Sequence, residues 1–440
     1  MSAADSAAPS PSASRRIPGD AVLVFAGLVV GAIAGLALDA LSPSAAARAA
    51  DIARPIGQLW LHALQMTIVP LVMSLLIVGI AQASDAAASG RIARRTLGWI
   101  FAIASGASIF TALFAPFALS FVPRDPELVA ALQAASGTVA APEGSVGASI
   151  AALVPTNAIA AAAQGAIVPL VVFTLCFGFA LTRIAPERRA PVLALAQGVA
   201  DAMLMVVKGV LRLGPIGVAA LILPVTVQAG GSVLGALGVY VALLIVIYLL
   251  LTALLYLVAC VGRGESLRRF ATAIVPAQVV AASTQSSLAS LPAMLDVSAN
   301  RLRYPPRVGA LVLPLAVSLL RIASPAQYLG VVAFIAWSQG VTLEPATLAA
   351  CAALAVVISL GSVGLPGQAS FMATNLPITQ AAGLPIAPLG LLLAVDLIPD
   401  IFATTGNVTG QLTVNSRVAR AEARDAVPTG DATSSVSPPS

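Results

Sequence analysis

The stretch SLGSVGLPGQAS, Ser359 to Ser370, interrupts an apolar segment that runs from residue 348 to residue 382. Its three glycines and Pro366 predict that no continuous helix crosses this stretch, because both residue types disfavour a helix interior. The apolar runs on both sides indicate that the interruption lies at membrane depth, where irregular backbone persists only if it lines a protected cavity. We therefore predict a helical hairpin whose tip gates access to a cavity. An ordinary loop outside the membrane is the alternative.

The rest of the chain has the composition of a polytopic membrane protein. Of its 440 residues, 59% are hydrophobic and 9% are charged, whereas soluble domains carry about 25% charged residues. A spanning helix needs about 20 apolar residues. Such segments, or shorter interrupted ones, cover residues 21–41, 56–84, 96–122, 150–182, 195–227, 233–261, 270–295, 308–339, 348–382 and 388–417. Interrupted segments in the second half point to a solute site, which we expect between residues 282 and 411.

The basic residues favour one topology. We predict an all-α integral membrane protein with eight transmembrane helices, two re-entrant hairpins at 270–295 and 348–382, and both termini cytoplasmic. This arrangement puts the arginine clusters between the spans on the cytoplasmic side, as the positive-inside rule requires. It leaves Arg48, Arg54 and Arg124 outside.

The two ends of the chain differ from the apolar interior. Residues 1–19 are rich in Ala, Ser and Pro, and residues 425–440 are similarly polar, so both are predicted to be disordered tails. Arg15 and Arg16 precede the first apolar block, which leaves a cleaved leader as an alternative. That block is too long for the apolar region of a signal peptide.

The sequence lacks the residues and motifs that several functional classes require. The net charge of +5 comes from scattered arginines, with Lys208 the single lysine, so it does not indicate nucleic-acid binding. His62 is the single histidine and the cysteines lie far apart, which excludes a multi-histidine metal site. No nucleophile elbow or P-loop motif occurs. We expect no enzyme activity and no cofactor other than a coupling ion, Na⁺ or H⁺.

Two polar segments stand in apolar surroundings. TQSSLASLP, residues 284–292, suits a hairpin tip whose hydroxyls and free N–H groups bind an anion, with a small-residue packing stretch as the alternative. In DLIPDIFATTGNVTGQ, residues 396–411, Asp396 and Asp400 are four residues apart and share a helix face. Carboxylates inside a membrane are costly and mark function; a pair at a water-facing helix end is the alternative.

These segments resemble the dicarboxylate/amino acid:cation symporter family, the glutamate-transporter-like sodium:dicarboxylate symporters. The motifs that carry the resemblance follow the family's order over nearly the whole chain: IGQLWLHALQMTIVPLVMSLLIVGIA (56–81), LVPTNAIAAAAQGAIVPLVVFTLCFGFAL (153–181), SSLASLP (286–292), GLPG (364–367) and NVTG (407–410). The resemblance implies an elevator-type transporter in the bacterial inner membrane that forms a homotrimer. Residues 20–262 would be mainly scaffold, with 96–122 moving, and residues 263–424 would form the transport core.

The resemblance also implies the roles of individual residues. Asp400 would hold the amino group of an amino-acid solute. Asn407 would hold its α-carboxylate, together with Ser286 and Ser287 of the first hairpin. The remaining residues expected around the solute are Gly364, Gly367, Ala403 and Thr404.

The match to the family fails at positions where family members carry charged side chains. Members that carry acidic solutes have an arginine where this chain has Ala403, and the family's other arginine site is Gln285. The cation-binding motif NMDGT corresponds to LRIAS, residues 320–324, and a further cation-binding aspartate corresponds to Gln411. Acidic side chains would therefore lack a partner, and sodium would lack ligands.

We expect a symporter with weakened or absent sodium coupling that favours a neutral amino acid. Asp396, Ser318, Arg321 and Gln411 are the predicted ion-coupling residues, and the guanidinium of Arg321 would replace a bound cation; it could instead reach towards the membrane interface. A C4-dicarboxylate or acidic amino acid carried with Na⁺ or H⁺ is the alternative. A channel, a membrane-embedded enzyme and a non-transporting sensor are the rival classes.

Overall fold

The computed structural model describes residues 20–88, 90–124, 154–261, 265–361 and 367–425, together with residues 126 and 129. Over these ranges the regular secondary structure is helical throughout. The predicted N-terminal tail, most of the C-terminal tail and Gly364 of the second hairpin tip lie outside the described residues.

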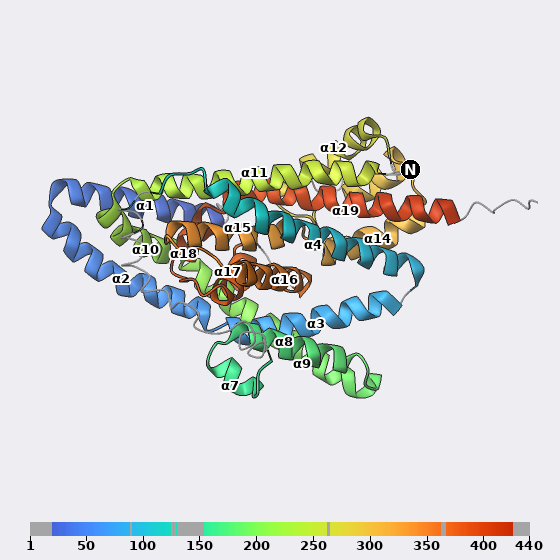
Figure 1. Cartoon of the computed structure of the whole chain (residues 1–440), viewed down its shortest axis with the longest axis horizontal. Coiled ribbons are helices and arrows are strands. Elements are labelled where there is room, and N and C mark those ends of the chain that lie inside the picture. The colour runs from blue at the N-terminus through green and yellow to red at the C-terminus, as the bar shows by residue number, and fades with distance from the viewer. Residues whose placement is uncertain are drawn as a thin grey trace, which may run out of the picture.

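The first half of the chain consists of long apolar helices (Figure 1). These are α1 (Asp20–Leu41), α2 (Pro43–Gln65), α3 (Ile68–Ala88), α4 (Arg91–Leu119), α7 (Ala158–Ala163), α8 (Ile167–Leu181), α9 (Pro186–Arg212), α10 (Gly214–Ala229) and α11 (Ser232–Cys260). Their starts follow local signals: the Ser42 hydroxyl accepts the N–H of Ala45 before α2, and the Asn157 side chain accepts two N–H groups of α7. Both are N-cap bonds.

The predicted span over 195–227 is two helices in the structure. α9 ends at Arg212 and α10 begins at Gly214. Pro215 lies in the first turn of α10, where a missing N–H costs nothing but where it prevents continuation of α9. The sequence prediction missed this break because the apolar pattern runs through it.

The second half consists of helix pairs separated by short breaks. They are α12 (Leu267–Thr284) with α13 (Leu291–Asp296), α14 (Pro306–Leu319) with α15 (Ala323–Ser338), α16 (Pro345–Gly361) with α17 (Gly367–Ala381), and α18 (Pro388–Val395) with α19 (Leu397–Asp425). A short π-helix, Val297–Arg301, follows α13. The predicted interrupted segments 270–295, 308–339 and 388–417 are therefore broken in the structure, whereas the predicted interruption of 348–382 lies outside the described residues.

Six helical stretches among the described residues are long and apolar enough to cross a membrane, and the bent pair α18–α19 is a seventh if counted as one span. The apolar helices α8, α10 and α16 are shorter. These lengths fit a multi-pass membrane protein. The arrangement of eight spans with two re-entrant hairpins stays a prediction.

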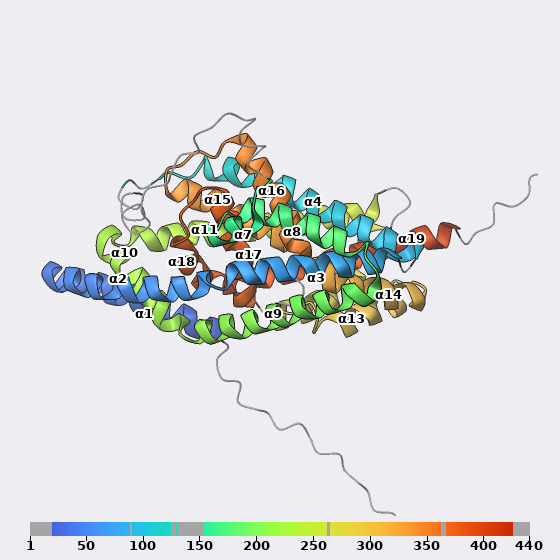
Figure 2. The same cartoon turned by 90° about the horizontal axis from the view of Figure 1, so that it is seen from below.

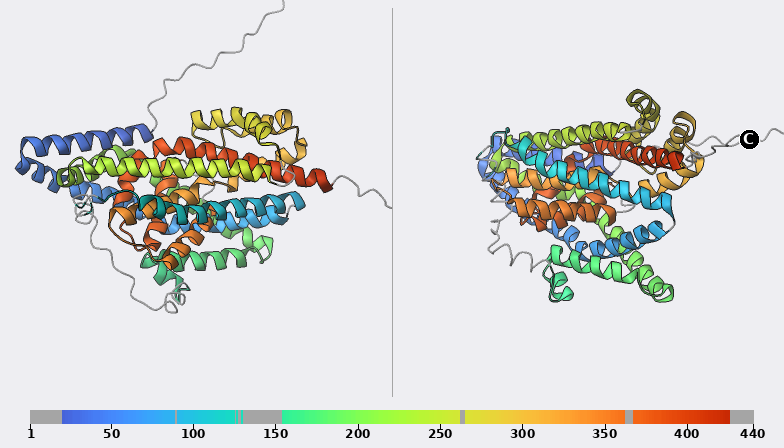
Figure 3. Two further views of the ribbon diagram at one scale, coloured as in Figure 1. Left: turned by 45° about the horizontal axis from the view of Figure 1, so that its top comes forward. Right: turned by 45° about the vertical axis from the view of Figure 1, so that its right-hand side comes forward.

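The core of the molecule is formed by the C-terminal helices. Every residue of α18 is buried, as are the run from Gly406 to Ser416 in α19 and all residues of α15 except Gln327. α19 packs against α11, α12 and α14, and α4 packs against α15 and α16; α11 and α19 lie side by side in Figures 1 and 3. α11, which lies within the predicted scaffold range, thus packs mainly on the C-terminal core.

A second packing unit joins the N-terminal helices. α10 packs tightly against α1 and α2, and α3 runs beside α9 (Figure 2). Glycines on α1 allow the close approach of α10: a Cβ added at Gly27 would lie 2.2 Å from the carbonyl oxygen of Pro215. Small residues spaced four apart are a common means of helix packing in membranes.

Candidate solute-binding site

The break between α14 and α15 is held by α19. Leu320 has extended backbone (φ −98°, ψ 109°) and ends α14. The Asn407 Oδ1 accepts the N–H of Ala323, 2.9 Å away, and the Gln411 Nε2 donates to the carbonyl oxygen of Leu320 at 3.0 Å. Broken helices leave N–H and C=O groups that need partners. Two side chains of α19 thus satisfy both sides of this break.

The bend between α18 and α19 brings a buried carboxylate to the same region. The two helices are bent by 69°, with Asp396 at the junction and 9% exposed. Its Oδ1 accepts a hydrogen bond of 2.7 Å from the Gln327 Nε2 on α15. The sequence analysis did not identify Gln327. Its signal is a polar side chain within the apolar run of α15, which is a functional indicator inside a membrane.

The first hairpin tip also reaches this junction. Gln285 ends α12 in the left-handed conformation (φ 50°), and its Nε2 donates to the carbonyl oxygen of Leu397 at 3.1 Å. The Ser286 hydroxyl accepts the N–H of Ala289 at 3.2 Å, while Ser287 is partly exposed. The tip is therefore anchored to α19 by the side chain that stands at an arginine position of the family.

Three charged residues lie within electrostatic reach of one another. Asp396 and Asp400 interact through their charges, and the charge of Arg321, at the break before α15, acts on Asp400. Unlike charges attract strongly at short range in a medium of low dielectric constant. The structure thus gathers two carboxylates and one guanidinium where α14, α15, α18 and α19 meet.

The other predicted residues differ in how deeply they are buried and in how close they lie to the junction. Ala403 and Thr404 are buried on α19, 6% and 4% exposed, within one turn of Asp400. Ser318, in contrast, is exposed on α14 and is not gathered with the buried polar side chains. Gly367 begins α17.

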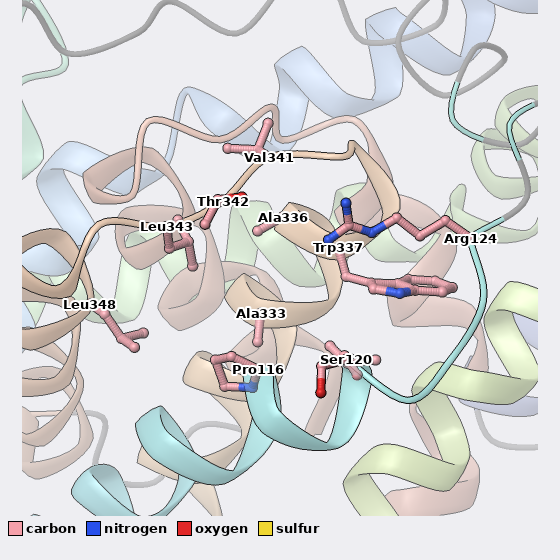
Figure 4. Close-up of a pocket in the computed structure, with 11 residues that line it drawn as sticks. Pro116, Ser120, Arg124, Ala333, Ala336, Trp337, Val341, Thr342, Leu343 and Leu348 are labelled. Carbon is pink, nitrogen blue, oxygen red and sulfur yellow. The ribbon is translucent and has the colours of Figure 1, made fainter.

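A cavity of about 200 Å³ lies away from this junction (Figure 4). It is bounded by the end of α4, by α15 and by the segment before α16, with Arg124 and Trp337 at one side. The Trp337 indole N–H donates to the carbonyl oxygen of Val122 at 3.3 Å. None of the predicted solute-binding residues lines this cavity, so we place the candidate site at the junction of the broken helices.

Comparison with known proteins agrees with the motifs. The sequence profile of the sodium:dicarboxylate symporter family matches residues 21–421. The chain is 28% identical to a proton/glutamate-aspartate symporter of Escherichia coli, over 88% of this chain and 89% of the relative. It is 25% identical to a C4-dicarboxylate transport protein of Laribacter hongkongensis, over 84% and 83%. It is 27% identical to the neutral amino acid transporter B(0) of Oryctolagus cuniculus, over 56% and 45%.

The profile covers nearly the whole chain, and the relatives are named as transporters of solutes rather than as enzymes. The broken helices and the membrane-length apolar helices described above fit that role. The resemblance drawn from the sequence motifs is therefore confirmed. The chain belongs to the sodium:dicarboxylate symporter family of membrane transporters.

Proposed function

We propose that this protein is a secondary transporter of a small neutral amino acid across the inner membrane, in which Arg321 takes the place of a bound cation. The chain's membership of a symporter family supports transport. The choice of solute and the loss of sodium coupling rest on the candidate site.

The candidate site contains groups that can bind the ammonium and the carboxylate of an amino acid. Asp400 can receive an ammonium group. The Nδ2 amide of Asn407 is not used in the bond to Ala323 and can donate to a carboxylate, as can the hydroxyls of Ser286 and Ser287. A zwitterionic solute adds no net charge to the cluster of Asp396, Asp400 and Arg321.

Ala403 is the observation that carries the preference for a neutral side chain. It is 6% exposed on α19 and offers no positive charge to a solute carboxylate. The second arginine position of the family is Gln285, whose amide is bonded to Leu397. A buried carboxylate without a partner costs about 3–5 kcal/mol, which corresponds to a discrimination of roughly a hundredfold or more.

Weak sodium coupling follows from the break before α15. Hard cations such as sodium take oxygen ligands, carboxylates among them, yet this break carries Leu320 and Ile322. The Leu320 carbonyl oxygen already accepts the Gln411 amide, which leaves it one lone pair for another partner. The permanent charge of Arg321 acts on Asp400, which supplies locally the positive charge that a cation would bring.

A C4-dicarboxylate is the second candidate solute. Arg321 is a guanidinium close to the site, and guanidinium groups bind carboxylates in a bidentate manner. The Laribacter relative is named as a C4-dicarboxylate transport protein. Competition of succinate against labelled serine distinguishes the two solutes.

We further propose an elevator motion in a homotrimer. The moving part would comprise residues 263–424 with α4, and also α11, because α11 packs along α19. The scaffold would then be α1, α2, α3, α8, α9 and α10.

Exchange in proteoliposomes tests the proposal. Vesicles loaded with unlabelled serine should take up labelled serine by saturable counterflow without sodium, and aspartate should compete roughly a hundredfold less well. Flux without counterflow would indicate a channel. Aspartate uptake that requires sodium would contradict the reading of Ala403 and of the break at residues 320–322.

A further inference from the structure

Three tyrosine hydroxyls are buried without a partner beside the candidate site. Tyr240, Tyr248 and Tyr328 are 0%, 2% and 1% exposed, and none of their hydroxyl oxygens has a hydrogen-bond partner in the part of the chain that the structure describes. Buried polar groups are nearly always hydrogen-bonded, so an exception needs an explanation. An unseen ligand or water is the ordinary one.

Two of the three hydroxyls are within electrostatic reach of Asp396, and the third is within reach of one of those two. Tyr240 and Tyr248 lie on α11, and the charge of Asp396 acts on both. Tyr328 interacts with Tyr248 and follows Gln327, which donates to Asp396 at 2.7 Å. We call these five residues the Asp396 cluster.

Charge balance leaves the group of Asp396, Asp400 and Arg321 one positive charge short. Asp396 and Asp400 carry two negative charges when both are ionised, and Arg321, which acts on Asp400, supplies one positive charge. The other helices packed on α18 add none: α10 and α17 contain no ionisable residue, and α1 carries its carboxylates, Asp20 and Asp39, at its two ends. An uncompensated carboxylate at membrane depth is costly.

We infer that the Asp396 cluster is the binding site of a coupling proton, which Asp396 carries while the hydroxyls of Tyr240, Tyr248 and Tyr328 solvate its carboxyl group. The inference rests on the proposed function. Binding transfers one proton from water to a carboxylate oxygen of Asp396, and release returns it on the other side of the membrane. When Asp396 is protonated, the net charge of Asp396, Asp400 and Arg321 is zero. This neutral group can cross the membrane interior at lower cost than the ionised one.

A proton fits this cluster better than a sodium ion does. Hydroxyls donate to a carboxylate when it is ionised and accept from it when it is protonated, so tyrosines serve both states. Sodium requires several acceptor oxygens, whereas Asp396 already gives one of its two oxygens to Gln327.

The experiment separates exchange from proton-driven uptake. Proteoliposomes are assayed for serine counterflow at equal pH, and for serine accumulation under an inside-alkaline gradient with the membrane potential clamped at zero. One coupled proton gives the wild type about tenfold accumulation for each pH unit of gradient. In Asp396→Asn, whose Oδ1 can still accept from Gln327, serine accumulation should no longer respond to the pH gradient.

Two further variants test the role of the hydroxyls. Tyr248→Phe and Tyr328→Phe each remove a hydroxyl that is unpaired in this structure and that the inference assigns to the ionised carboxylate, so the pH of half-maximal uptake should rise in both. Tyr256→Phe is the matched control on the same helix, because the Tyr256 hydroxyl accepts from Gln278 at 2.9 Å instead; its pH of half-maximal uptake should stay at the wild-type value.

Two results overturn the inference while the transport proposal stands. One is that Asp396→Asn still accumulates serine in response to the pH gradient as the wild type does. The other is that a sodium gradient, and not a pH gradient, drives accumulation by the wild type. Absence of counterflow in the wild type would overturn the proposed function itself, and with it this inference.

Discussion

Arg321 lies in the segment LRIAS, residues 320–324, whose sequence was matched to the family's cation-binding motif. The structure sets its charge against Asp400, beside a break whose backbone groups are already bonded to Asn407 and Gln411. A fixed guanidinium differs from a bound ion because it cannot dissociate. The account therefore expects transport that neither needs sodium nor gains from it.

Arg321→Met tests this role at a single position. Removing the guanidinium leaves Asp400 unbalanced at membrane depth, where an ionised carboxylate costs about 2.5–3.5 kcal/mol, so sodium-independent serine exchange should fall by about a hundredfold. Arg183→Met, at an exposed arginine after α8, is the control and should exchange normally. Exchange at the wild-type rate by Arg321→Met would contradict the role assigned to this residue.

Which of these residues the sequence could identify depends on the signal that each one carries. Asp396, Asp400 and Arg321 are charged within apolar segments, so their cost in a membrane makes them visible in the sequence alone. The tyrosines of α11 and α15 have no such signal, since aromatic residues are common in apolar helices, and Gln327 carries only the weaker signal of an uncharged polar side chain. The tyrosines stand out because their buried hydroxyls have no hydrogen-bond partner among the described residues, and this is visible only in the tertiary structure.

At the scale of elements, the breaks in the helices are the common feature of the site. Two breaks are held by three amide side chains: Asn407 and Gln411 hold the one before α15, and Gln285 ties the tip between α12 and α13 to the start of α19. Glycine and proline are the signals on which the two hairpins were predicted, and the tip of the second lies outside the described residues. The break at residues 320–322 was not predicted at that position, since LRIAS has no helix-breaking residue.

Gln411→Leu tests whether that break depends on α19. The substitution keeps the volume but leaves the buried carbonyl of Leu320 without a donor, at a cost of about 1–3 kcal/mol. The melting temperature of the purified protein should therefore fall. Thr405→Val, on the exposed face of α19 where the hydroxyl bonds within its own helix, should melt close to the wild type. Equal melting temperatures for the two variants would show that the break is held by other contacts.

At the scale of the whole molecule, the cytoplasmic arginines predicted from the topology are engaged in specific contacts. Glu265, 3% exposed, contacts Arg420 and lies 3.0 Å from the Tyr304 hydroxyl. Glu422 is paired with Arg91 at 3.0 Å and with Arg95 at 2.6 Å. These pairs tie the starts of α4 and α12 to the end of α19. The positive-inside rule predicts which side the arginines occupy but contains no information about partners.

A glycine substitution can test whether α1 packs closely on α10. In Gly27→Val the new side chain would overlap the backbone of Pro215, since even a Cβ would lie 2.2 Å from its carbonyl oxygen. Overpacking of this kind costs about 1–3 kcal/mol or more, so the yield of folded protein and its melting temperature should drop. Gly98→Val, where an added Cβ meets nothing within 4 Å, is the control. A normal yield of Gly27→Val would mean that α1 and α10 are not packed as described.

The central claim is that the solute site lacks a positive charge at Ala403 and therefore selects a neutral amino acid. The most direct measurement is the ratio of aspartate to serine uptake by Ala403→Arg, compared with Ala403→Met, which adds similar length without charge. The account predicts that wild type and Ala403→Met favour serine. In Ala403→Arg the ratio should shift towards aspartate by roughly a hundredfold. A wild type that already favours aspartate, or an arginine variant whose ratio equals that of the methionine variant, would contradict it.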